Sequence, residues 1–426
     1  MGAAFHLRCI GCGAIHDPWE AIYVCRRCGD LLDVVYDYDR LPAGLRAMWR
    51  RRPLSVWRYR EILPVGDRSK VVTLGEGGTG LHRCPGLARA IGMRDLYVKN
   101  EGENPTGSFK DRGMTVGVTK ALELRMGTVA CASTGNTSAS LSAYAAKASL
   151  DCIVIVPSGK VALGKLAQAM VHGARIVAIR GNFDDALAIV RKLCSAYSVY
   201  LLNSINAFRL EGQKTLAMEV ADQLGAAPDS IIVPVGNAGN ISAIWKGLVE
   251  LHRLGLLDAL PRMIGIQAEG ASPIVDAIRA GDAAITPVAS PETIATAIRI
   301  GRPVNWKKAM RAIRESGGLA EKVSDGEIVE AQSLLARTEG LFVEPASAAS
   351  IAGLRKLVAL GAVEEDERVV CVTTGHGLKD IGIVIGRFPP IEEVEASLES
   401  VRACLADPFV RAAFSFGDGF GRAKAR

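Results

Sequence analysis

The chain has 426 residues, more than one ordinary hydrophobic core accommodates, so we expect two or more domains. Apolar residues make up 49% and charged residues 23%, which is typical of a globular protein with a large core, and no run approaches the roughly 20 apolar residues of a membrane span. The net charge of +6 suits small anionic ligands. Apart from residues 50–52, the sequence has no block of like charges that would indicate nucleic-acid binding. We therefore expect neither a membrane nor nucleic acid as a partner.

The first forty residues differ from the rest because they contain two Cys-x-x-Cys-Gly knuckles. The four cysteines are Cys9, Cys12, Cys25 and Cys28. Two such knuckles supply the four thiolates of a tetrahedral zinc site, so we expect residues 1–38 to form a zinc-ribbon-like module. The alternatives are reduced, empty cysteines, a redox pair, or a ribbon that binds nucleic acid or a partner protein. Trp19 and Tyr23 are too few aromatic residues for a nucleic-acid stacking platform.

Residues 31–36 predict a strand, and residues 40–70 hold three prolines in what we interpret as a linker packed on a later domain. From about residue 90, short apolar runs alternate with helical stretches. The expected strands are 96–98, 129–131, 152–156, 175–179, 231–233, 264–266 and 369–372. The expected helices are 136–149, 161–172, 183–197, 210–225 and 240–255. This alternation predicts an α/β fold with open, doubly wound parallel sheets, which bind ligands at the carboxyl ends of their strands.

The remaining cysteines favour a reducing compartment. Cys131, Cys152 and Cys371 lie in apolar, strand-like runs, where buried thiols are typical. The first eight residues contain no basic region followed by an apolar run, so we expect no signal peptide and a cytoplasmic location.

The first of three unusual loops spans residues 101–113, after the strand that ends at Lys99. It is polar, contains glycine and proline, and leads into a helix with Lys110 in its first turn. An ordinary loop with a solvated lysine is the alternative. A helix N-terminus and the neighbouring Arg112 disfavour the charged form of Lys110, and a lysine with a lowered pKa is a nucleophile toward carbonyl groups.

The second and third loops resemble anion sites. Residues 132–138 are mostly small hydroxyl and amide residues that open a helix, more than one N-cap requires. Residues 234–240 contain two glycines, so the backbone could approach a phosphate closely. The loop lacks the Gly-Lys-Ser/Thr ending of a P-loop and by itself is a weak signal.

Together these loops indicate a phosphorylated aldehyde cofactor, pyridoxal phosphate. A threonine hydroxyl group in the segment 373–374, just after the late strand 369–372, could meet the pyridine nitrogen. A neutral hydroxyl leaves that nitrogen unprotonated more often than a carboxylate does. His376 we interpret as a packed or capping residue without a catalytic role.

Residues 104–113, which contain Lys110, resemble the cofactor-lysine motif of the threonine synthases, which are pyridoxal-phosphate enzymes of the tryptophan-synthase-β-like fold (fold type II). Other segments similar to this family are 133–138, 206–215, 236–240, 293–301 and 344–349. The resemblance covers roughly residues 70–385 with its motifs in family order. Residues 110–113 and 293–301 favour threonine synthase over the dehydratases. One departure is Gly80, where the family usually has proline; it loosens a turn.

The resemblance implies a domain organisation and a homodimer. The cofactor-binding domain would comprise residues 39–130 and 205–390. Residues 131–204 would form a small mobile domain, and residues 391–426 a C-terminal helical extension.

The resemblance also implies site residues. Lys110 would hold the cofactor covalently and act as the catalytic base. The other expected cofactor-binding residues are Asn136 (at the 3-hydroxyl), Gly236, Asn237, Ala238, Gly239 and Asn240 (at the phosphate) and Thr374 (at the pyridine nitrogen). The expected substrate-binding residues are Ser133, Thr134 and Thr137 for the carboxylate and Arg209 for the phosphate. A guanidinium grips phosphate bidentately, although a surface arginine is the alternative for Arg209.

The implied reaction converts O-phospho-L-homoserine and water to L-threonine and phosphate. Alternatives within the fold are a threonine or serine dehydratase, which needs no substrate-phosphate site, and a cysteate-synthase-like enzyme that uses phosphoserine and sulfite. A non-catalytic binding protein is disfavoured by the presence of Lys110, Asn136 and Thr374.

Overall fold

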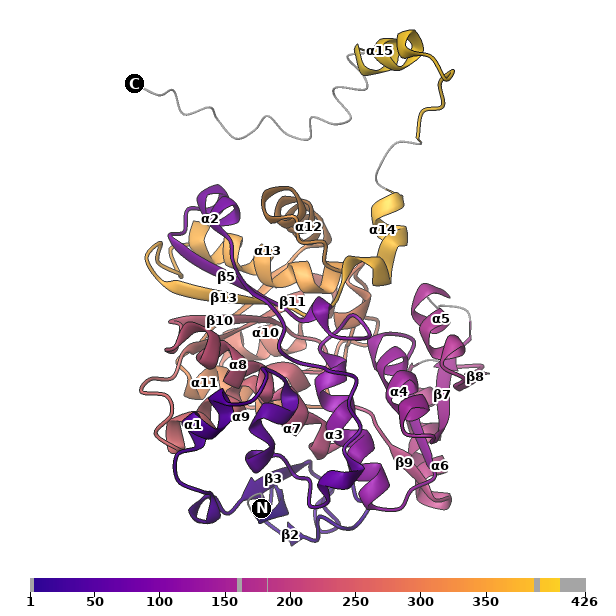
Figure 1. Cartoon of the computed structure of the whole chain (residues 1–426), viewed down its shortest axis with the longest axis vertical. Coiled ribbons are helices and arrows are strands. Elements are labelled where there is room, and N and C mark those ends of the chain that lie inside the picture. Colours follow the sequence, from indigo (N-terminus) through magenta and orange to yellow (C-terminus); the bar gives the residue numbers. More distant parts are fainter. Residues whose placement is uncertain (1–3, 159–162, 182, 387–390, 407–426) are drawn as a thin grey trace. The chain divides into compact units, whose positions relative to one another are not determined.

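The computed structural model describes residues 4–158, 163–181, 183–386 and 391–406 (Figure 1). The chain divides into a first unit, Met1–Lys379, and a second unit, Asp380–Arg426. No helix in the described part of the chain is long and apolar enough to cross a bilayer.

The N-terminal module is a three-stranded antiparallel sheet. β1 (Phe5–Cys9) lies between β2 (Ile15–His16) and β3 (Leu32–Tyr36). Alternate residues of β3 are fully buried, as expected for a sheet with one covered face. Leu7 and Val34 pack in one cluster with Val116 and Phe208 of the α/β part of the first unit, so the module is docked on that part.

Residues 40–70 form short helical turns that pack on the α/β part of the first unit, as predicted for the linker. The turns are η1 (Tyr38–Arg40), α1 (Leu45–Arg50), η2 (Val56–Ile62) and η3 (Arg68–Lys70). The rings of Trp49 and Tyr59 meet edge to face at 5.0 Å, and both are buried against Leu216 and Ile231.

The larger sheet has six strands in the order β12-β11-β10-β13-β5-β4. The strands are β12 (Ala320–Val323), β11 (Arg262–Ala268), β10 (Ser230–Pro234), β13 (Arg368–Thr373), β5 (Asp95–Asn100) and β4 (Leu81–Arg83). All neighbours are parallel except β4 and β5. Because successive side chains of a strand point to opposite faces, Ile232 and Ile231 enter different core clusters.

Helices cover both faces of this sheet. The cluster that contains Ile232 holds α2 (Pro85–Ile91), α12 (Asp325–Glu339) and α13 (Pro345–Ala359). The cluster that contains Ile231 holds α8 (Thr215–Leu224), α9 (Gly239–Arg253), α10 (Pro273–Ala280) and α11 (Trp306–Glu315). This is the doubly wound arrangement predicted from the continuous apolar strands.

The smaller sheet is parallel throughout, in the order β8-β7-β6-β9. Its strands are β8 (Arg175–Ile179), β7 (Asp151–Pro157), β6 (Thr128–Ala132) and β9 (Val199–Leu201). One face packs on α3 (Lys110–Glu123), α4 (Asn136–Lys147) and α5 (Leu163–Val171), and the other on α6 (Phe183–Ala196).

The seven strands expected after residue 90 are all present, and the structure adds short strands that the apolar runs did not reveal. The stretch 210–225 is two helices rather than the single one expected: α7 (Ala207–Gln213) and α8 meet at Lys214. The remaining short turns are η4 (Glu101–Glu103), η5 (Glu269–Ala271), η6 (Thr296–Ile298) and η7 (Gly377–Asp380).

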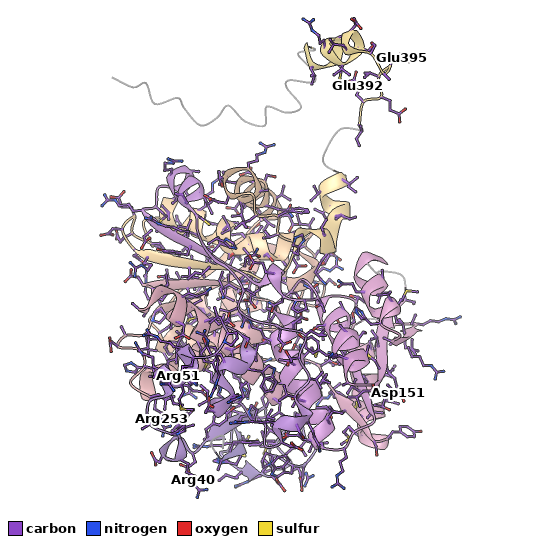
Figure 2. The ribbon with its side chains drawn as sticks, in the orientation of Figure 1. Arg40, Arg51, Asp151, Arg253, Glu392 and Glu395 are labelled. Carbon is purple, nitrogen blue, oxygen red and sulfur yellow. The ribbon has the colours of Figure 1, made fainter. Side chains whose placement is uncertain are left out.

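The second unit contains α14 (Ile381–Ile385) and α15 (Leu398–Ala406). Only α15 lies in the expected C-terminal extension, 391–426, whose residues 407–426 lie outside the described residues. Figure 2 shows exposed arginines on the first unit, including Arg40, Arg51 and Arg253, and exposed Glu392 and Glu395 on the second.

Candidate active site

A cavity of about 500 Å³ lies where the predicted loops meet. Its lining comes from the loop after β6, the loop after β10, the start of α3 and the end of β13. These are carboxyl ends of parallel strands, the place where open α/β sheets bind ligands. Its volume is within the range of small-molecule sites.

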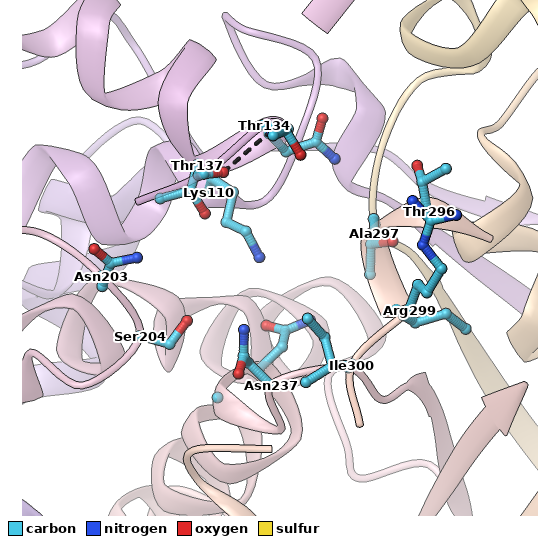
Figure 3. Close-up of a pocket in the computed structure, with 18 of the residues that line it drawn as sticks. Lys110, Thr134, Thr137, Asn203, Ser204, Asn237, Thr296, Ala297, Arg299 and Ile300 are labelled. Carbon is cyan, nitrogen blue, oxygen red and sulfur yellow. Dashed lines mark hydrogen bonds between the residues drawn. The ribbon is translucent and has the colours of Figure 1, made fainter. Parts of the chain in front are cut away.

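Lys110 lines the cavity as the first residue of α3 (Figure 3). Its Nζ lies 3.7 Å from the centroid of the Phe109 ring. Burial, followed by the positive charge of Arg209, lowers the pKa of Lys110 to about 7, and Glu344 opposes this shift. The predicted direction of the shift is confirmed.

The predicted contribution of Arg112 to that shift is wrong. The Arg112 guanidinium is buried in ion pairs with Glu101 and Glu219, at 2.6 Å each, and does not act on Lys110. The charge that does so belongs to Arg209, which is distant in sequence.

The loop after β6 contributes Ser133, Thr134 and Thr137 to the lining, and Figure 3 shows Thr134 and Thr137 beside Lys110. Asn136 begins α4 and donates from Nδ2 to Glu344 Oε1 at 2.8 Å. Its buried Oδ1 has no hydrogen-bond partner. An unpaired buried acceptor is costly and indicates that a ligand donor belongs there.

The loop after β10 lines the cavity with all five expected residues: Gly236, Asn237, Ala238, Gly239 and Asn240. A Cβ atom at Gly236 would lie 3.0 Å from Ala297 O and from Ile298 Cα, so the close approach of these segments needs glycine. The buried amide of Asn240 has no hydrogen-bond partner at either atom. The loop leads directly into α9, whose N-terminus favours an anion.

Thr374 lines the same cavity at the end of β13. The Phe109 amide donates to Thr374 O at 3.0 Å, so the chain just before Lys110 is anchored to the segment that carries Thr374. Residues more than 260 positions apart in sequence are thereby held on one cavity.

Arg209 lies on α7 and is 1% exposed, so it is not a surface arginine, and it is not among the residues that line the cavity. Its Nε, Nη1 and Nη2 atoms have no hydrogen-bond partner. Burial lowers its pKa to about 10. The backbone and Cγ of Arg209 pack against Gly113 and Gly117, the glycine face of α3.

Several lining residues had no role in the sequence analysis. Asn203 and Ser204 follow β9, and in Figure 3 Ser204 lies near Asn237. The strand Val199–Leu201 is too short to show as an apolar run, which concealed this loop. Arg299 lies within the quoted segment 293–301, and only the fold places it on the cavity.

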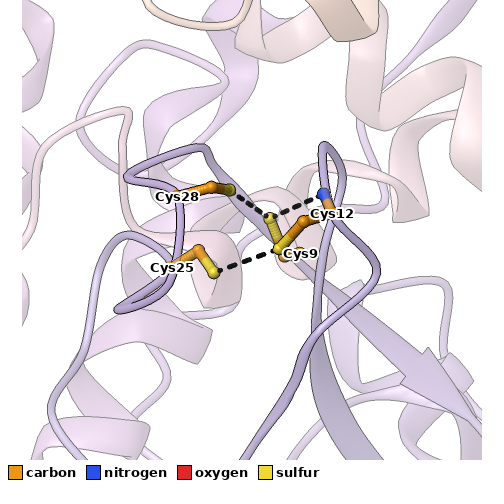
Figure 4. Close-up of side chains that lie close together, drawn as sticks. All are labelled: Cys9, Cys12, Cys25 and Cys28. Atoms are coloured by element: carbon orange, nitrogen blue, oxygen red, sulfur yellow. Dashed lines mark hydrogen bonds between the residues drawn. The ribbon is translucent and has the colours of Figure 1, made fainter.

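The four N-terminal cysteines form a candidate metal centre (Figure 4). Their sulfur atoms all lie within 4.8 Å of one another, with Cys9–Cys28 at 3.4 Å and Cys12–Cys25 at 3.6 Å. Tetrahedral zinc with Zn–S bonds of about 2.3 Å requires S–S separations of about 3.8 Å. The knuckles therefore match a structural zinc site in both ligand type and spacing.

Comparison with known proteins gives one consistent result. The sequence model of the family described as "Pyridoxal-phosphate dependent enzyme" matches residues 72–375. The chain is 60% identical over 402 residues to threonine synthase of Methanosarcina acetivorans, covering 94% of this chain and 98% of that protein. It is 54% identical over 354 residues to threonine synthase of Mycobacterium tuberculosis, covering 83% and 95%.

Solved structures share the fold at lower identity. Maize serine racemase superposes with a TM-score of 0.62 at 20% identity, covering 72% of this chain and 90% of that one. A fungal L-serine ammonia-lyase from Rhizomucor miehei superposes with a TM-score of 0.63 at 22% identity, covering 72% and 96%.

Proposed function

Because the chain belongs to the threonine synthases, a family of pyridoxal-phosphate-dependent enzymes, we propose that it converts O-phospho-L-homoserine and water to L-threonine and phosphate. The observation that carries the proposal is Lys110, a lysine whose pKa is lowered to about 7 and which lines one cavity with the loops after β6 and β10 and with Thr374. When bound, the cofactor supplies an electron sink that acidifies the Cα proton of an amino acid.

The residues present fit pyridoxal phosphate. Gly236, Asn237, Ala238, Gly239 and Asn240 would hold its phosphate, and Asn136 its 3-hydroxyl group. Thr374 would meet its pyridine nitrogen. Two observations support this assignment: the buried amide of Asn240 and the Oδ1 of Asn136 have no hydrogen-bond partner.

Lys110 has two tasks in this proposal. Its neutral amine holds the cofactor before the substrate arrives, and afterwards it accepts the Cα proton and serves as base at Cβ. A general base works best when its pKa is near the operating pH, and a pKa of about 7 satisfies that condition.

The substrate carries two anionic groups that need partners. Ser133, Thr134 and Thr137, at the start of α4, would bind its carboxylate with hydroxyl and backbone donors. Arg209 would bind its phosphate; since it does not line the cavity in this structure, this role requires that a domain closure bring its guanidinium to the substrate. The buried guanidinium of Arg209 has no partner, and pairing with an anion would remove this cost.

The expected small domain would close over the substrate and exclude water until it is required. A contact that supports closure is formed by Lys379, whose Nζ donates to Gln168 Oε1 on α5 and to Thr106 O before α3, each at 2.6 Å. This contact joins the loop after β13 to a helix of the smaller sheet.

For Cys9, Cys12, Cys25 and Cys28 we propose a structural zinc ion, supported by the sulfur spacing. For the whole protein we propose a cytoplasmic homodimer without nucleic acid as a partner. The dimer rests on the family resemblance, the location on the N-terminal sequence and the cysteines, and the exclusion of nucleic acid on the charge distribution. Sedimentation equilibrium of the purified protein tests the dimer.

The decisive experiment is an absorption spectrum of the purified protein before and after addition of O-phospho-L-homoserine, with phosphate and threonine measured together. We expect a visible cofactor band that shifts with substrate and equal amounts of the two products. Lys110→Ala is the control and should give neither product. A visible band without phosphate release would favour a dehydratase or a phosphoserine-using enzyme and overturn the proposed substrate.

A further inference from the structure

Ser347 is a buried residue near the start of α13 that has no assigned role. It is 0% exposed and does not line the cavity, but its hydroxyl contacts the chain where β13 ends. Its Oγ accepts hydrogen bonds from the Thr374 amide at 2.9 Å and the Gly375 amide at 2.8 Å. It also lies 2.9 Å from Thr374 Oγ1 and 3.2 Å from Gly375 O.

The hydrogen-bond capacity of a hydroxyl group decides the direction of the contact with Thr374. A serine hydroxyl has two acceptor lone pairs and one proton. The two amide groups are donors only, so they occupy both lone pairs of Ser347 Oγ. Thr374 therefore cannot donate its proton to Ser347.

The proton of Ser347 goes either to Thr374 Oγ1 or to Gly375 O, and both choices have the same consequence for Thr374. Within the described residues, Ser347 is the one hydrogen-bond partner of the Thr374 hydroxyl group. Thr374 lines the cavity, so its unused proton is available to an acceptor in the cavity.

We propose that Ser347 is a positioning residue that makes Thr374 an obligatory hydrogen-bond donor to the cofactor's pyridine nitrogen and so keeps that nitrogen unprotonated. The proposal rests on the cofactor site described above. A nitrogen that must accept a hydrogen bond cannot also carry a proton. Ser347 thus influences the electronic state of the cofactor without contacting it.

The test uses pyridoxal phosphate labelled with ¹⁵N in its ring, loaded onto the full chain and observed by solid-state ¹⁵N NMR across a pH series. In the wild type we expect the resonance of an unprotonated, hydrogen-bonded nitrogen. In Ser347→Ala the Thr374 hydroxyl group loses its one described partner, so it is no longer oriented and both lone pairs of its oxygen are free to accept. The resonance should then move toward the protonated form, increasingly at low pH. Cofactor affinity should fall about tenfold, because buried amides lose their acceptor.

Two further variants separate positioning from a general structural effect. Ser350→Ala, one turn along α13, removes another buried hydroxyl that donates to Ser347 O and should leave the resonance unchanged. In a Thr374→Val background, Ser347→Ala should shift the resonance no further, because the group through which Ser347 acts is gone. If the alanine variant does not fold, Ser347→Cys takes its place. Cysteine keeps the side-chain shape but accepts hydrogen bonds only weakly, so it should shift the resonance in the same direction.

The outcomes are distinct. A wild-type protein without any bound cofactor resonance would overturn both the proposed function and the role of Ser347. A bound cofactor whose nitrogen is already protonated in the wild type, or is unaffected by both Ser347 substitutions, would overturn the role of Ser347 alone.

Discussion

At the scale of single residues, the site depends on a lysine whose lowered pKa makes its neutral form available near pH 7. Burial and the positive charge of Arg209 lower the pKa of Lys110 from 10.5 to about 7. A partly buried group that prefers its neutral form lowers the stability of the fold whenever the unfolded chain binds a proton there.

The first prediction concerns the stability of the cofactor-free protein. Between pH 7 and 10.5 the unfolded state binds more protons at Lys110 than the folded state, so this penalty is complete below pH 7 and vanishes above 10.5. Lys110→Met should raise the free energy of unfolding by about 5 kcal/mol at pH 6, since each tenfold change in acidity corresponds to about 1.4 kcal/mol. Urea denaturation at pH 6 and pH 10 checks this; an equal gain at both values would contradict it.

The second prediction concerns the pH dependence of cofactor attachment. Only the neutral amine attacks the aldehyde, so the rate of incorporation into cofactor-free protein should rise with pH through a midpoint near 7. Removal of the positive charge in Arg209→Met should move that midpoint upward. Stopped-flow absorbance measures the rates.

Arg299→Met is the matched control for this experiment. Arg299 also lines the cavity but is not among the charges that act on Lys110, so its removal should leave the midpoint in place. An equal displacement in both variants would show that Arg209 has no specific effect.

At the scale of elements, α3 is placed by its contact with α7. Small residues let the two helices approach closely: a Cβ atom at Gly212 on α7 would lie 1.7 Å from Arg112 O on α3. A Cβ atom at Gly113 would lie 2.9 Å from Arg209 O. Because Lys110 begins α3, this contact sets where the lysine lies in the cavity.

The third prediction is that Gly212→Ala forces α3 away from α7. Backbone atoms cannot yield as a flexible side chain can, so we expect a loss of about 2 kcal/mol or more in unfolding free energy. Cofactor affinity should fall as well, because Lys110 is displaced. The control is Gly127→Ala, since a Cβ atom there meets nothing within 4 Å. Equal denaturation midpoints and cofactor affinities for the two variants would refute the argument.

At the scale of the whole first unit, the cysteine module is joined to the cofactor loop. Asp30 pairs with Lys307 at 2.5 Å, and Lys308 Nζ donates to Leu32 O at 2.9 Å. Both lysines lie on α11, directly after Asn305. The backbone N–H of Asn305 donates to Asn237 O at 3.1 Å, and Asn237 belongs to the loop assigned to the cofactor phosphate.

The fourth prediction follows from this connection. Removal of zinc by a chelator should lower the melting temperature and also weaken cofactor binding, and added zinc should restore both. Cys28→Ser should reproduce the effect, whereas Cys194→Ser, outside the knuckles, should not. Elemental analysis with thermal denaturation and cofactor titration checks it. Metal-free protein with undiminished stability and affinity would disprove the zinc assignment.

Much of the fold was predictable because local runs of apolar residues mark the buried strands. The strands near 129–131, 231–233 and 369–372 are continuous apolar runs, and such runs are buried on both faces. The short strand Val199–Leu201 and the break at Lys214 were not predictable, because pairing with β6 and packing of two helices decide them.

The sequence by itself determined the order of the motifs, the lysine at a helix start and the glycine-rich loop after β10, since local backbone preferences govern these features. Only the tertiary structure decided which distant groups meet. The unpaired charge of Arg209 acts on Lys110, Ser347 faces Thr374, and the loop after β9 enters the cavity. Charges and hydrogen bonds act through space, and burial, which sets their strength, exists only once the chain has folded.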